Sequence, residues 1–151
     1  MSGTDSKSKD GFSSQERIAM KERAAELKAE ARRARDADKA AADEADVLAK
    51  IAEMPDEDRR LAELVHSIVM SAAPELAPKL YYGQPGYARG GKVLCFFRSG
   101  QMDKERYSTF GFSVQAGLDD DSGFWATSYA LIEPTKAALE HLGALVKQAV
   151  K

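Results

Sequence analysis

Apolar residues recur at helical spacing in the stretch that follows Pro55. They are Leu61, Leu64, Val65, Ile68, Val69 and Ala72. This i, i+3, i+4, i+7 pattern predicts an amphipathic helix with one face in a core. Pro55 suits the first helical position, and the carboxylates of Asp56-Glu57-Asp58 suit the positive end of a helix dipole. We therefore expect a helix that begins at Pro55 and ends before Pro74.

Two further segments show helical spacing. Pro134 is expected to open a closing helix, whose apolar side holds Ala138, Leu139, Leu142, Leu145, Val146 and Ala149. A shorter helix is expected over Ala45–Met54, with Val47, Leu48, Ile51 and Met54 on one side.

Between these helices the pattern changes to alternation, which is typical of strands. Extended segments are expected at Lys79–Tyr82, Tyr87–Arg89, Lys92–Arg98, Tyr107–Val114 and Trp125–Ile132. Gly83–Gly86 separates the first two of these segments, and within it Gln84-Pro85-Gly86 is expected to form a rigid turn. Gly90-Gly91 is a hairpin signal. In Lys92–Arg98, one face should hold Val93, Cys95 and Phe97 and the other face Leu94 and Phe96. A strand that is apolar on both faces is expected to be central and covered on both sides.

The order of these elements indicates an α+β two-layer sandwich. Short connections between consecutive strands imply antiparallel pairing. We expect an antiparallel sheet of three to five strands with N- and C-terminal helices packed on it. A central strand that is apolar on both faces needs a cover on its second face. The candidates, in order of preference, are the N-terminal helices, a second subunit and a ligand.

The first part of the chain contributes little to a core. Residues 1–12 are expected to be a disordered tail and residues 13–43 a helical arm, followed by an α+β domain over 44–151. Ser13 and Glu16 match a capping box, in which each side chain accepts a hydrogen bond from the other's backbone N–H. The large apolar residues of the arm are few: Ile18, Met20 and Leu27. The arm is either a solvated helix or a helix that binds a protein partner or a second copy through these residues.

Composition and charge narrow the class of protein. The chain has 22 Lys plus Arg and 24 Asp plus Glu, and a net charge of −2 argues against nucleic-acid binding. The single cysteine excludes a disulfide framework and a cysteine-based zinc cluster. The longest apolar run, Val93–Phe97, is far shorter than the ~20 residues of a membrane span. Because Met1–Gly11 lacks the apolar segment of a signal peptide, a cytoplasmic location is expected. A monomer or a weak homodimer is also expected.

No arrangement of residues points to catalysis. The sequence has no P-loop, no G-x-G-x-x-G or H-E-x-x-H motif and no Ser-His-Asp order. Cys95 lies among apolar residues and is expected to be a small buried hydrophobe rather than a nucleophile. His66 and His141 have no acid or nucleophile at a recognisable spacing and are expected at the surface. An enzyme is therefore not expected.

Several motifs in the second part of the chain resemble those of one bacterial family. They are Tyr81–Tyr87, Gly91–Phe97, Arg106–Phe112, Leu118–Asp120 and Trp125–Thr127, followed by a helix rich in Ala, Leu and Val. This pattern resembles the YdhG-like family of unknown function, over about Ala45–Lys151. The resemblance implies a compact α+β fold. One branch of the family is described as frataxin-like and is a proposed intracellular iron chaperone, so the resemblance also implies a binding or chaperone-like function.

The candidate metal site is the acidic run Asp119-Asp120-Asp121. Hard cations prefer carboxylate oxygens, and the resemblance implies weak iron binding at such a surface cluster. The alternative is a solvated loop whose aspartates cap a turn. A second acidic patch, Asp56-Glu57-Asp58 with Glu63, is better explained as charge at the N-terminus of a helix.

The candidate ligand site is a group of aromatic and polar residues on the predicted strands. They are Tyr81, Tyr82, Gln84, Tyr87, Arg98, Tyr107 and Trp125. Aromatic rings with an arginine suit a small planar or anionic ligand, or a protein partner. Such a site predicts a concave pocket with Trp125 and at least two of the tyrosines. The alternative is cross-strand packing within the sheet.

Overall fold

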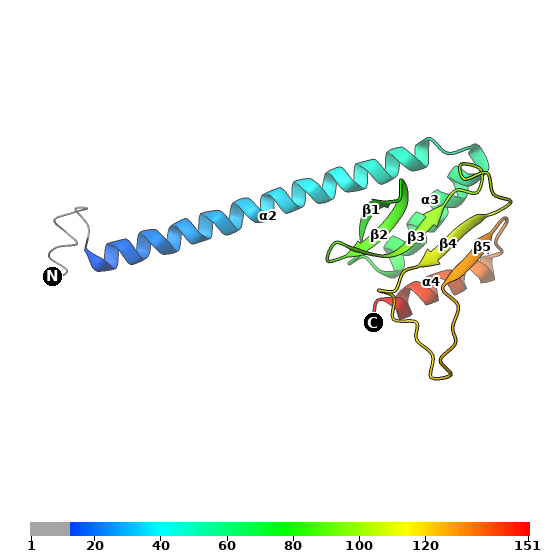
Figure 1. Ribbon diagram of the computed structural model, residues 1–151. Helices are drawn as coiled ribbons and strands as arrows, with labels where there is room; N and C mark the ends of the chain where they lie inside the picture. Colours follow the sequence, from blue (N-terminus) through cyan, green and yellow to red (C-terminus); the bar gives the residue numbers. More distant parts are fainter. Residues whose placement is uncertain (1–12) are drawn as a thin grey trace. The chain divides into compact units, whose positions relative to one another are not determined.

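The computed structural model describes residues 13–151, and the expected tail at 1–12 lies outside the described residues (Figure 1). The helices are α2 (Ser14–Ala52), α3 (Asp56–Ala72) and α4 (Lys136–Ala149). The strands are β1 (Ala77–Tyr81), β2 (Gln84–Arg89), β3 (Lys92–Arg98), β4 (Ser108–Phe112) and β5 (Ser128–Leu131). The chain divides into two compact units, Met1–Lys39 and Ala40–Lys151. The predicted α+β class is confirmed, because the second unit joins helices to one antiparallel sheet in the order β1-β2-β3-β4-β5.

Helix α2 begins at the predicted capping box. The Ser13 N–H donates to Glu16 Oε1 at 3.2 Å, and the Glu16 N–H donates to Ser13 Oγ at 3.1 Å. The separate helix expected over Ala45–Met54 is wrong, because α2 runs without a break to Ala52. Its last turns bury Val47 and Ile51, whereas the arm residues Ile18, Met20 and Leu27 are exposed.

The other two helices pack an apolar face into the core, as their spacing predicted. Helix α3 buries Leu61, Val65 and Val69 and ends before Pro74, and α4 buries Leu142 and Val146. The expected start of α4 at Pro134 is two residues early. Thr135 is the N-cap of α4, and its side chain accepts a hydrogen bond from the Ala138 N–H at 3.1 Å.

Two-residue turns connect the first three strands. Gly90-Gly91 joins β2 to β3 as predicted, with both residues at positive φ as a type I′ turn requires. The rigid turn expected at Gln84-Pro85-Gly86 is wrong, because all three are paired residues of β2. The turn before them is Tyr82-Gly83, with φ values of 48° and 79°.

The pairing of β2 with β3 contains an irregularity that changes which side chains are buried. The register shifts between Tyr87 and Ala88, so that Tyr87 pairs with Cys95 and Ala88 pairs with Val93. As a result, the two consecutive residues Leu94 and Cys95 are both buried in the core, while Val93 is only half-buried. The strict alternation predicted for Lys92–Arg98 fails at this bulge, because an extra residue in one strand resets the alternation of its side chains.

Helices α3 and α4 lie on the same side of the sheet, as Figure 1 shows. Residues of the sheet that face them include Tyr87, Phe97 and Phe110, all fully buried. The Tyr87 hydroxyl lies 2.9 Å from His66 Nδ1 of α3, which joins the two layers. Within residues 40–151 no helix covers the other face of the sheet, so the preferred expectation of an N-terminal helical cover fails for the part of α2 in this unit.

Candidate functional site on the open face of the sheet

The seven residues of the predicted ligand site do not form one cleft. Tyr87 is fully buried against α3, and Gln84 is also buried. Both polar atoms of the Gln84 amide are engaged: Nε2 donates to Asp103 at 2.9 Å, and Oε1 accepts from the Ser99 N–H. These two side chains are therefore parts of the core and of a loop anchor, and neither is available to a ligand.

Three of the seven residues, together with Phe96, form a continuous surface on the open face. We call Tyr81, Tyr82, Phe96 and Arg98 the Tyr82 patch. The Tyr81 ring lies 5.1 Å from the Phe96 ring and 4.6 Å from the Tyr82 ring, between centroids. Phe96 and Arg98 are alternate residues of β3, so their side chains leave the same face of the sheet.

Two glycines let the Phe96 and Tyr81 side chains lie close to the sheet. A Cβ atom on Gly111 would lie 2.4 Å from the Phe96 ring, and one on Gly86 would lie 2.8 Å from Tyr81 Cβ. Gly86 and Gly111 are the residues that pair with Phe96 on its two sides. The ring of Phe96 thus occupies the space that a side chain would fill, and this arrangement fixes its position on the sheet.

Tyr82 is unusual in both its backbone and its exposure. Its φ of 48° lies in the left-handed region, which is strained for a bulky residue and is normally occupied by Gly, Asn or Asp in such a turn. Its side chain is 81% exposed, with one ring contact to Tyr81. Neither burial nor turn preference accounts for a tyrosine here.

Arg98 is held in place by the loop that follows β3. Its Nε donates to Asp103 Oδ2 at 2.8 Å and its Nη2 to Asp103 Oδ1 at 3.3 Å. Its Nη1 lies 3.5 Å from the Tyr82 carbonyl oxygen. Asp103 therefore contacts both Arg98 and Gln84, and it orients the guanidinium of Arg98 beside the Tyr82-Gly83 turn. The sequence did not indicate this role, because Asp103 lies in a loop.

The other two predicted residues lie elsewhere. The guanidinium of Arg106 lies over the Tyr107 ring, 5.1 Å from its centroid. Trp125 lines a separate hollow of about 350 Å³ together with Tyr129, which was not among the predicted tyrosines. This hollow contains none of the predicted tyrosines, so it is not the expected pocket that combines Trp125 with at least two of them.

The acidic run Asp119-Asp120-Asp121 lies on an exposed loop before β5. Asp120 Oδ2 accepts hydrogen bonds from the hydroxyl and from the backbone N–H of Ser122, and these bonds lower the pKa of Asp120. Over residues 13–151, no three His, Cys, Asp or Glu side chains are grouped so that they could hold a metal ion. The contacts of this loop are those of an aspartate that caps a turn.

Asp58 has a role that the sequence analysis missed. It is buried and accepts hydrogen bonds from the Ser99 hydroxyl, from the Gln101 N–H at 3.0 Å and from the Gln101 amide at 3.2 Å. These bonds anchor the loop after β3 to the first turn of α3. A signal was present, because Asp58 precedes Leu61 by three residues and Val65 by seven, which places it on the apolar stripe.

His66 and Cys95 are both shielded from water, to different extents. His66 is half-buried and bonded to Tyr87, so its expected surface position is wrong. Cys95 is fully buried, as predicted, and burial raises the pKa of its thiol to about 12. A neutral buried thiol is a poor nucleophile.

Comparison with protein-family models, curated proteins and solved structures finds no match to this chain. Among residues 13–151, every helix is too short or too polar to cross a membrane.

Proposed function

We propose that this protein is a protein-binding module that recognises a partner through the Tyr82 patch. The partner segment carries an apolar or aromatic side chain that packs on Tyr81 and Tyr82, with a carboxylate next to it. The observation that carries this proposal is Tyr82, a strained and exposed tyrosine at the edge of a fixed aromatic surface. Strained residues concentrate at functional sites, where selection for binding outweighs their cost in stability.

The composition of the patch favours a protein partner. Tyrosine, phenylalanine and arginine are enriched in the centres of protein interfaces, and tyrosine and arginine are frequent hot-spot residues. Small-molecule sites are usually concave. The hollows of about 520 Å³ between α3 and α4 and about 350 Å³ beside Trp125 are lined by other residues, so the patch surface suits a partner that lies across it.

The charges beside the patch favour a carboxylate on the partner. Lys79 and Tyr81 are alternate residues of β1, so the Lys79 side chain leaves the same face as the patch. The guanidinium of Arg98 lies on the other side of the rings, next to the Tyr82 carbonyl. Because Arg98 is already paired with Asp103 at 2.8 Å, Lys79 is the cation that favours a partner carboxylate and raises its association rate.

Weak iron binding, which the resemblance to the YdhG-like family implies, stays a prediction. No contact within residues 13–151 favours it over protein binding.

The test is selection of peptides from a displayed random library with the full-length protein, followed by affinity measurement on synthetic peptides. We expect enriched peptides to combine an aromatic or branched apolar residue with Asp or Glu. Tyr82→Asn should weaken their binding at least about tenfold, because an interface tyrosine is commonly worth more than 1.4 kcal/mol. The same change should stabilise the fold by about 1 kcal/mol, because Asn tolerates the left-handed backbone.

Phe124→Asn is the matched control, because Phe124 is an equally exposed aromatic at 87% but lies on the loop before β5. It should leave peptide affinity unchanged. The proposal fails if the selected peptides bind Tyr82→Asn as tightly as the unmodified protein. It also fails if, in an NMR titration with these peptides, the amide chemical-shift changes of the protein centre on Phe124 and Trp125.

A further inference from the structure

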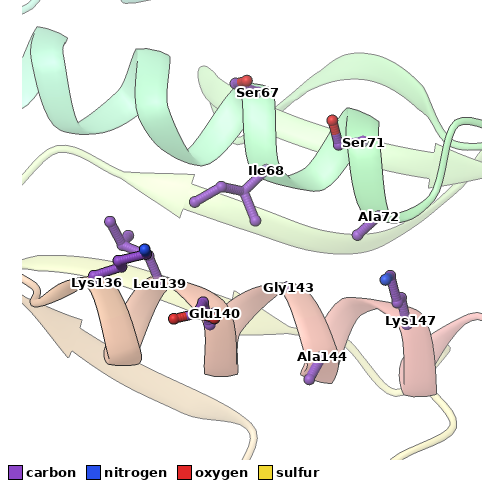
Figure 2. A pocket seen from close by; sticks show the side chains of 10 residues that line it. All are labelled: Ser67, Ile68, Ser71, Ala72, Lys136, Leu139, Glu140, Gly143, Ala144 and Lys147. Atoms are coloured by element: carbon purple, nitrogen blue, oxygen red, sulfur yellow. The ribbon is translucent and has the colours of Figure 1, made fainter.

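Helices α3 and α4 form a groove on their solvent side. The hollow has a volume of about 520 Å³ and lies between Ser67, Ile68 and Ser71 of α3 and Gly143 and Ala144 of α4. Figure 2 shows these side chains, with Lys136 and Lys147 toward the two ends of α4 and Glu140 between them. Half of the ten lining residues are Gly, Ala or Ser, so that a further helix could approach the backbone closely at these positions.

Gly143 has no explanation in the packing of α3 against α4. Glycine inside a helix is unfavourable compared with alanine. A Cβ atom on Gly143 would lie 3.4 Å from Ile68 Cγ2, which is an ordinary van der Waals contact. An alanine would therefore contact Ile68 without a severe clash, and the absence of its methyl group leaves this part of the groove open to a partner.

Three charged side chains line this side of α4: Glu140 and Lys147 flank Gly143 and Ala144, and Lys136 lies one turn before Glu140. Glu140 and Lys147 lie at equal distances along the helix from the midpoint between these two residues. Both side chains are exposed, and among residues 13–151 neither takes part in an ion pair. An antiparallel copy of the helix, placed with its midpoint on this one, would set Glu140 opposite Lys147 and Lys147 opposite Glu140.

We propose that the α3–α4 groove is the interface of a homodimer, in which α4 packs antiparallel against α4 of a second copy about a two-fold axis at Gly143 and Ala144. The small residues at the centre allow close helix approach. The two Glu140–Lys147 pairs on either side fix the register. The two charges next to the centre, Glu140 and Lys147, are self-complementary and favour a second copy, because an isologous interface must present both members of each contact on one surface; Lys136 lies outside this pairing. This surface is separate from the Tyr82 patch and does not depend on it.

The experiment is analytical ultracentrifugation of the full chain over about a hundredfold range of concentration, since dimers form by mass action. We expect a monomer–dimer equilibrium. Glu140→Lys and Lys147→Glu should each raise the dimer dissociation constant at least about tenfold, because each replaces two attractive contacts with two repulsive ones. The double swap, with both changes in one chain, restores the pairs and should return the constant to within about threefold of the original.

Two further variants separate the interface from general effects on the fold or charge. Gly143→Ala should raise the melting temperature of the protein and yet weaken the dimer, because it removes a helix-destabilising residue and fills the centre of the groove. Glu133→Lys makes the same charge change as Glu140→Lys at an exposed position before α4, and it should leave the dimer unchanged.

The proposal is overturned if the protein is monomeric at the highest concentration. It is also overturned if either single swap leaves the dissociation constant unchanged, or if the double swap dimerises no better than the single swaps. Circular dichroism of each variant confirms that the helices are intact before the constants are compared.

Discussion

One hydrogen bond between two side chains far apart in sequence links the helix layer to the sheet. His66 Nδ1 and the Tyr87 hydroxyl are 2.9 Å apart, and both groups are removed from water to different extents. Burial lowers the pKa of His66 from its ordinary value of 6.5, and the charge of Glu44 opposes this shift. Burial likewise raises the pKa of Tyr87 well above its ordinary range. Both groups are therefore neutral in the folded protein at pH 7.

This pair predicts a pH-dependent stability. Below pH 6.5 the unfolded chain protonates His66 more readily than the folded chain does, so the free energy of unfolding falls as the pH decreases from about 7.5 toward the lowered pKa. His66→Gln should reduce the slope of stability against pH in this range, measured by urea denaturation at several pH values. His141→Gln changes an exposed histidine and serves as the control. An unchanged slope in His66→Gln would contradict the assignment.

The hydrogen-bond partners of a side chain could be predicted from the sequence only where they are near neighbours in the chain. Ser13 and Glu16 form the capping box that their spacing indicated, because both partners lie within one helical turn. The partner of His66 lies 21 residues away on a strand, and the partners of Asp58 lie more than 40 residues away. No local pattern specifies such pairs, since chain folding alone brings them together.

At the scale of elements, glycine positions were informative in two different ways. Gly90-Gly91 correctly predicted a hairpin, because both residues can take positive φ. The sequence predicted the turn between β1 and β2 too late in the chain, because a tyrosine at positive φ, as found at Tyr82, is disfavoured in such turns. Gly111 carries no turn signal, and its role became clear only from the Phe96 ring that lies over it.

The contact between Gly111 and Phe96 predicts a specific coupling between β3 and β4. Gly111→Ala should destabilise the protein by about 2 kcal/mol, because the new Cβ atom would lie 2.4 Å from the Phe96 ring and must displace it. In a Phe96→Ala background the same change should cost less than about 0.5 kcal/mol. Urea denaturation of the four proteins of this cycle measures the coupling. Equal costs in both backgrounds would show that the ring does not limit position 111.

At the scale of the whole molecule, the division into two units separates the arm from the core. The unit Ala40–Lys151 contains the entire sheet and the core cluster, and the end of α2 contributes Val47 and Ile51 to it. Residues 13–39, the described part of the first unit, contribute none of the residues of that cluster. The boundary between the units therefore falls inside one continuous helix.

This division predicts the outcome of two truncations. A fragment of residues 40–151 should melt within about 3 °C of the full chain, because it keeps the whole core. A fragment of residues 53–151 should melt at least about 10 °C lower, because it loses two buried apolar side chains worth roughly 1.5–3 kcal/mol each. Differential scanning calorimetry checks both. Equal melting temperatures for the two fragments would exclude a structural role for Val47 and Ile51.

The sequence by itself determined the classes and the order of the elements. Apolar periodicity marked α3 and α4, alternation marked the strands, and Gly90-Gly91 marked a hairpin, because all of these depend on residues that are near neighbours in the chain. Only the tertiary structure decided which of the seven candidate residues meet. The register of β1, β2 and β3 sends Tyr87 to the core and leaves Tyr81 and Arg98 on the open face. The face of a sheet on which a side chain lies depends on pairing and bulges, and a single inserted residue reverses it.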